Sequence, residues 1–173
     1  MRKIVFDIET SNIFADVGRH DPSLLDIAII AIYDSETDSY STYLKEELNK
    51  LWPILERADM LIGYNSDHFD IPLLNKYYPG DLTKLKSLDI LKEIHKAYGR
   101  RMKLDQIAEG TFSKKKTGNG LKATEWWQKG EIEKVREYCI DDVRLTKEVY
   151  DFACANNKLI FKEGGKLHEI KLD

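Results

Sequence analysis

The stretch "IVFDIET", Ile4 to Thr10, has the alternation of a β-strand and sets the pattern from which the fold can be read. Successive side chains of a strand point to opposite faces. One face is then entirely apolar, whereas the other carries Asp7 and Glu9. Two acids on an exposed strand are common, so this pair gains meaning only from acids elsewhere in the chain.

The segments that follow predict a mixed β-sheet. In "DIAIIAIYDSETDSYSTYL", residues 26–44, two β-rich runs flank a polar turn, and with the first strand they predict an antiparallel meander. The run "DMLIGYN", residues 59–65, is nearly all apolar, as expected of a strand buried on both faces. The run "LKSLDI", residues 85–90, is the candidate for a fifth strand.

Helical periodicity surrounds these strands. Helices are expected over residues 46–58, in "FDIPLLNKYYPG" (69–80, stopped by its Pro-Gly end), and over 91–98, 104–111 and 132–155. The segment "KLIFKEGGKLHEIKL" predicts a C-terminal β-hairpin over about 158–173, because its two glycines permit positive φ. The order of elements indicates an α/β fold, a mixed five-stranded sheet flanked by helices, in one domain spanning residues 1–173.

The bulk composition excludes several classes of protein. A net charge of −3 and a pI of 5.9 argue against a protein that binds long nucleic acid mainly by neutralising phosphates. Basic runs in "GRRMK" (99–103) and "SKKKTGNGLK" (113–122) are then most simply solvated loops. No apolar run approaches the roughly 20 residues that cross a bilayer, and no secretory signal is visible. We therefore expect a cytoplasmic protein with no membrane role, in which Cys139 and Cys154 are reduced and act as small apolar residues.

Two adjacent aspartates lie in the amphipathic helix "REYCIDDVRLTKEVY", residues 136–150. At about 100° per residue, Asp142 falls in the middle of the apolar arc and Asp141 on the polar side. Asp142 should face inward, with Tyr138 beside it four residues earlier. An inward carboxylate needs a partner, and no basic residue shares its arc. Other acids and a cation are the remaining candidates.

Asp70, in "GYNSDHFDIPLL" (63–74), follows a buried strand that ends near Asn65. Two interpretations stay open: Asp70 caps the next helix, or it is a metal ligand beyond the end of a strand. If Asp7, Glu9, Asp70 and Asp142 converge, their repulsion raises their pKa values unless divalent metal neutralises them. Such an all-carboxylate site selects Mg²⁺ or Mn²⁺ before zinc.

These motifs, in this order, resemble a known family. "FDIET", "GYNSDHFD" and "YCIDD" are similar to the three motifs of the DEDD superfamily of 3′-to-5′ exonucleases, in its tyrosine-bearing branch (DEDDy), which has an RNase H-like fold. The resemblance spans roughly residues 3–150 and extends to the exonuclease domain of family B DNA polymerases and to related stand-alone nuclease domains. The position that the histidine branch uses is occupied here by Glu137, so the tyrosine branch is the better match.

The resemblance implies a two-metal-ion exonuclease that releases 5′-mononucleotides from the 3′ end of single-stranded nucleic acid, DNA more than RNA. The implied ligands of two Mg²⁺ or Mn²⁺ ions are Asp7, Glu9, Asp70 and Asp142. Tyr138 would orient the attacking water, since an ordinary phenol with a pKa near 10 is a poor base at about neutral pH. Substrate contacts are expected from Thr10, Ser11, Asn65, Lys114, Lys115 and Lys116, and Ile13 and Phe14 are candidates for a wedge against the last bases.

The sequence is also compatible with other functions. RNase H-like domains support several nuclease chemistries, so the substrate could be RNA or the cleavage internal. A catalytically silent nucleic-acid-binding module is the alternative of another class, although none of the four acids is lost. These 173 residues contain no polymerase domain, which leaves proofreading in doubt and association with a polymerase or helicase open.

Overall fold

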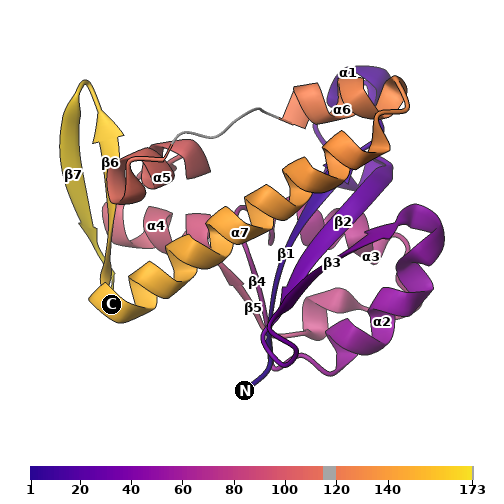
Figure 1. Ribbon diagram of the computed structural model, residues 1–173, viewed down its shortest axis with the longest axis horizontal. Helices are drawn as coiled ribbons and strands as arrows, with labels where there is room; N and C mark the ends of the chain where they lie inside the picture. The colour runs from indigo at the N-terminus through magenta and orange to yellow at the C-terminus, as the bar shows by residue number, and fades with distance from the viewer. Residues whose placement is uncertain (115–119, 173) are drawn as a thin grey trace.

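The computed structural model describes residues 1–114 and 120–172 and is built around a five-stranded sheet of order β3-β2-β1-β4-β5 (Figure 1). The strands are β1 (Lys3–Thr10), β2 (Ile27–Asp34), β3 (Ser39–Leu44), β4 (Met60–Gly63) and β5 (Ser87–Asp89). β2 pairs antiparallel with β1 and β3, whereas β4 pairs parallel with β1 and β5. The predicted mixed sheet with an N-terminal antiparallel meander is confirmed.

Helices cover both faces of this sheet. They are α1 (Phe14–Val17), α2 (Leu48–Glu56), α3 (Asp70–Asn75), α4 (Ile90–Tyr98), α5 (Leu104–Phe112), α6 (Gly120–Gln128) and α7 (Ile132–Asn156). One core cluster joins Val5 and Ile62 of the sheet to α4, α5 and α7, and a second joins Phe6 and Leu61 to α2 and α3. None of the described helices is long and apolar enough to span a bilayer.

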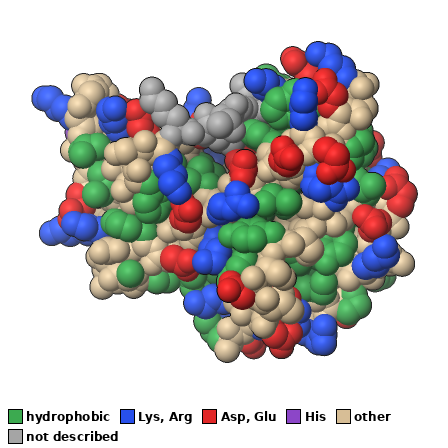
Figure 2. All heavy atoms as spheres, in the orientation of Figure 1, with side chains coloured by type: hydrophobic (Ala, Val, Ile, Leu, Met, Phe, Trp, Pro, Cys, Tyr) green, Lys and Arg blue, Asp and Glu red, His purple; other side chains and the backbone are tan. Residues whose placement is uncertain are grey.

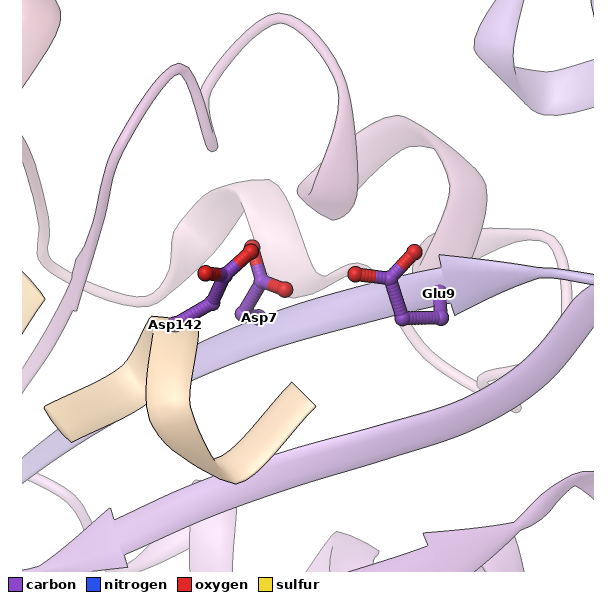
Figure 3. A group of neighbouring side chains, drawn as sticks. All are labelled: Asp7, Glu9 and Asp142. Atoms are coloured by element: carbon purple, nitrogen blue, oxygen red, sulfur yellow. The ribbon is translucent and has the colours of Figure 1, made fainter. Parts of the chain in front are cut away.

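The alternation of β1 sorts its side chains as the sequence predicts. Ile4, Phe6 and Ile8 lie in the core beneath α2 and α3. Asp7 and Glu9 point to the opposite face, which α7 crosses obliquely (Figures 1 and 3). The acids of β1 therefore meet the long helix rather than solvent alone.

The C-terminal hairpin forms a separate two-stranded sheet of β6 (Lys158–Glu163) and β7 (Lys166–Lys171). Its turn is made by Gly164 and Gly165, both at positive φ, as predicted. The hairpin lies beside α5 at the C-terminal end of α7 (Figure 1). Gly110 of α5 is required there, because a Cβ would lie 2.5 Å from the backbone of β6.

Three helices differ from the prediction, and the first is α1, since no helix was expected over residues 14–17. α3 ends at Asn75, before the Pro-Gly pair that was expected to stop it. α6 is not among the predicted helices, and its fixed place depends on tertiary contact. Thr124 of α6 is buried, and its hydroxyl shares its proton between the carbonyl oxygen of Thr10 at 3.1 Å and that of Gly120, one turn earlier in α6, at 3.2 Å. The bond to Thr10 is one of the contacts between α6 and the end of β1.

Candidate active site

Three carboxylates from two distant segments converge where α7 crosses β1. Oxygens of Asp7, Glu9 and Asp142 all lie within 4.8 Å of one another (Figure 3). Glu9 and Asp142 are buried, and Asp7 is half-buried. The predicted inward direction of Asp142 is confirmed, whereas the side chain of Asp141 is 57% exposed and pairs with Arg144.

Asp70 reaches the same region by a different route. Its Oδ1 accepts the backbone N–H of Ile8 at 3.1 Å. β4 pairs with β1 only as far as Val5, so this amide lies beyond the end of the paired strand. The helix-cap interpretation of Asp70 is wrong: Asp70 is the first residue of α3, Phe69 occupies the N-cap position, and no side chain caps the helix. Asp70 lines the same hollow as the other three acids but is not in the group that lies within 4.8 Å.

Burial makes negative charge unfavourable at this site. The pKa of Asp70 is raised to about 7, mainly by desolvation. The hydrogen bond from the N–H of Ile8 lowers this pKa, and the negative charge of Asp89 raises it further. Desolvation and then the neighbouring acids raise the pKa of the Cys139 thiol. Carboxylate oxygens are hard donors, so this group fits a divalent cation such as Mg²⁺ or Mn²⁺. A bound cation would offset the cost of burying the negative charges.

Cys139 is a member of the site that the sequence did not single out. It is fully buried on the β1 side of α7. Its Sγ lies 3.3 Å from the carbonyl oxygen of Asp7 and 3.8 Å from Asp7 Oδ2. Cys154, treated in the same way from sequence, is exposed.

The acids open into a hollow of about 640 Å³, a volume within the usual range of ligand sites. Its walls include Thr10, α1, the start of α6 and Tyr138. The ring of Tyr138 packs edge-on against the ring of Trp126, with 6.0 Å between the ring centroids. No Lys, Arg or His is found among the described residues that line it. The carboxylates thus form the floor of a hollow whose walls are mostly apolar.

Comparison with known proteins agrees with this architecture. A model of the RNase H superfamily matches residues 4–154. The chain belongs to the RNase H superfamily. The acidic cluster at Asp7, Glu9 and Asp142 is consistent with a nuclease active site of that superfamily.

Among solved structures, this RNase H domain is similar to the family B DNA polymerase from the hyperthermophilic archaeon Pyrobaculum calidifontis, with a TM-score of 0.67 and 20% identity. The match covers 89% of this chain and 24% of the polymerase chain. This chain therefore spans only about a quarter of the length of that protein. At this identity the likeness shows the fold. No curated protein sequence gives a significant match.

A second hollow, of about 530 Å³, adjoins the first in the RNase H domain and shares Tyr64, Asn65 and Gly120 with it. Asn65 has a positive φ of 63°, and its N–H donates to Asp89 at 2.8 Å. The Asn65 side-chain oxygen accepts from Arg101 Nη2 at 2.7 Å. Arg101 lines this second hollow and was read from sequence only as part of a solvated loop. The basic run at residues 99–103 is the sequence feature that could have pointed to Arg101 as a site residue.

The remaining predicted substrate contacts lie in different places. Thr10 and Asn65 line the acidic hollow, as do Ile13 and Phe14. Ser11 does not, and its N–H donates to the carbonyl oxygen of Asp26 at 2.9 Å.

The predicted lysine contacts are placed only in part. Lys114 is exposed and pairs with Glu148 of α7 at 2.6 Å. Lys115 and Lys116 lie outside the described residues. On the face seen in Figure 2, basic and acidic side chains are interspersed, without one large basic patch.

Proposed function

We propose that this RNase H domain is a metal-dependent 3′-to-5′ exonuclease. Its substrate is the 3′ end of single-stranded nucleic acid, DNA more than RNA, and its product is a 5′-mononucleotide. The observation that carries this proposal is the convergence of Asp7, Glu9 and Asp142 within 4.8 Å, with Asp70 and Tyr138 lining the same hollow. The resemblance of the three motifs to tyrosine-branch DEDD exonucleases supports the direction of cleavage.

In this proposal the four acids hold two divalent cations, Mg²⁺ or Mn²⁺. Asp7 together with Glu9 and Asp142 would hold one cation, and Asp7 together with Asp70 would hold the other. Bound cations at such a site activate water and stabilise the leaving oxygen of a phosphodiester. The protein contributes rigid carboxylates from a central strand and a long helix, whose spacing is set by core packing rather than by loops.

Tyr138 orients the reacting groups in this scheme. It is one helical turn before Asp142 on α7, and both side chains line the hollow. In this proposal its hydroxyl hydrogen-bonds the attacking water, while the acids supply the negative charge that binds the cations. Loss of the hydroxyl should therefore lower the rate without removing the metal site.

Substrate binding is assigned to the walls around the acids. Thr10 lies at the end of β1 and receives the terminal sugar, and Ile13 and Phe14 contact the last base. Arg101, which is held by Asn65, binds a backbone phosphate in the adjoining hollow. Lys114, Lys115 and Lys116 remain proposed phosphate contacts, and Ser11 is retained as a secondary one.

The direct test uses matched 5′-labelled DNA and RNA single strands with Mg²⁺, Mn²⁺ or EDTA. The expected result is a ladder that shortens from the 3′ end, release of 5′-mononucleotides, faster loss of DNA, and no reaction in EDTA or with Asp7→Ala. Internal fragments would favour an endonuclease, and faster loss of RNA an RNA-directed enzyme. Binding without any cleavage would leave a silent nucleic-acid-binding module.

A further inference from the structure

The thiol of Cys139 has a specific contact that its role as a small core residue does not require. Cys139 lies between Tyr138 and Asp142 on α7 and is fully buried. Its sulfur lies 3.3 Å from the carbonyl oxygen of Asp7 and 3.8 Å from Asp7 Oδ2. Both acceptors belong to one residue, which is the acid in the middle of the proposed metal site.

Contacts to an aspartate in this position can fix the plane of its carboxylate. The terminal torsion of an aspartate has a broad, roughly two-fold profile. Asp7 is half-buried and less enclosed than Glu9 and Asp142, so packing alone holds it less firmly. The single proton of the Cys139 thiol has two acceptors on Asp7, the main-chain carbonyl oxygen at 3.3 Å and Oδ2 at 3.8 Å. When it is donated to Oδ2, it restrains that rotation.

A thiol suits this task chemically. A lysine or arginine at position 139 would also donate to Asp7, but its positive charge would compete with a cation for the same carboxylates. A thiol is a weak, uncharged donor and a poor ligand for hard cations. It can therefore orient Asp7 without occupying the place of the metal.

We propose that Cys139 is a positioning residue that orients the Asp7 carboxylate for divalent-cation binding. This inference rests on the metal site of the proposed function, but not on the nuclease reaction. Residues that orient metal ligands typically change metal affinity about 10- to 100-fold when they are replaced. Cys139 is expected to act at the lower end of that range because a thiol donates weakly.

Three substitutions separate the donor of Cys139 from its volume. Cys139→Ser keeps a donor but is less apolar, Cys139→Val fills the space without a donor, and Cys139→Ala has neither. If Cys139 positions Asp7, Mn²⁺ affinity follows the donor: the serine variant stays within about twofold of wild type, and the valine and alanine variants weaken about tenfold. If Cys139 only fills the core, Mn²⁺ affinity instead follows the melting temperature.

Mn²⁺ affinity is measured by electron paramagnetic resonance of the free ion. The background is Cys154→Ser, which removes the other thiol of the chain. Val149→Ala is the matched control, because Val149 is also fully buried on α7 and makes no contribution to the acidic hollow. It should lower the melting temperature and leave Mn²⁺ affinity unchanged.

Infrared spectroscopy supplies a second readout that does not depend on activity. In the Cys154→Ser background the S–H stretching band reports Cys139 alone. A hydrogen-bonded thiol should absorb at lower frequency than an exposed one, and its band should shift when Mg²⁺ binds. A band at the position of a free thiol, insensitive to Mg²⁺, would overturn the inference.

The outcomes also separate this inference from the proposed function. Donor-dependent Mn²⁺ binding in a protein that releases no nucleotides would support the role of Cys139 and reject the exonuclease. Nucleotide release, with Mn²⁺ affinity in all three variants equal to that of wild type, would support the exonuclease and reject the role of Cys139. A wild-type protein that binds no Mn²⁺ would overturn both.

Discussion

The carboxylate of Asp70 accepts the backbone N–H of Ile8 at 3.1 Å, although the two residues are 62 positions apart. This bond ties the first turn of α3 to the central strand just beyond the end of β4. It places a fourth carboxylate at the level of Asp7 and Glu9. Burial also brings the protonation of Asp70 into a measurable pH range, because it raises the pKa of this carboxyl to about 7.

Stability of the metal-free protein should fall as pH rises towards 7. An unfolded Asp70 loses its proton near the ordinary pKa of 3.8, whereas burial raises the pKa in the folded protein to about 7. Between these values the folded state holds a proton that the unfolded state has lost, so each increase in pH favours unfolding. The melting temperature in EDTA should decrease between about pH 5 and about pH 8.

Asp70→Asn is the control for that dependence. The amide does not titrate, so the variant should show a flatter profile in EDTA and melt above wild type at about pH 8. Saturating Mg²⁺ should raise the wild-type melting temperature most at the same pH, because the cation favours the ionised carboxylate. Identical slopes for wild type and Asp70→Asn would contradict the assignment.

The adjacent aspartates of α7 should respond oppositely to the same chemical change. Asp142→Asn removes a charge from the buried cluster and should lower the rate of nucleotide release by at least about 100-fold. Asp141→Asn changes an exposed side chain paired with Arg144 and should stay within about twofold. Rates on one 5′-labelled strand compare them, and a greater loss from Asp141→Asn would reject the assignment.

How far the sequence could lead differs among these residues. Asp7, Glu9 and Asp142 were placed because strand alternation and helical phase are local properties. Asp70 could not be resolved, since its partner Ile8 is remote in sequence. The contact between Cys139 and Asp7 was invisible for the same reason, because nothing local distinguishes a buried thiol with a polar partner from one without.

The basic side chain of Arg101 should contribute substrate binding rather than chemistry. Arg101→Ala is expected to raise KM about tenfold with little change in kcat, and to reduce the slope of log affinity against log salt by about 0.7 for a single strand. Arg100→Ala is the matched control, because Arg100 pairs with Glu163 on the hairpin at 2.8 Å. Equal effects from both substitutions would mean that net charge, not the place beside Asn65, matters.

The hydrogen bond from Thr124 to Thr10 should hold the wall of the acidic hollow. Thr124→Val preserves shape but leaves the Thr10 carbonyl without this donor, so it should cost about 1 kcal/mol in urea unfolding. Because Thr10 also lines the hollow, the same variant should raise KM for the strand while Thr124→Ser restores both properties. If Thr124→Val lowered stability but left KM unchanged, α6 would support the fold without shaping the substrate site.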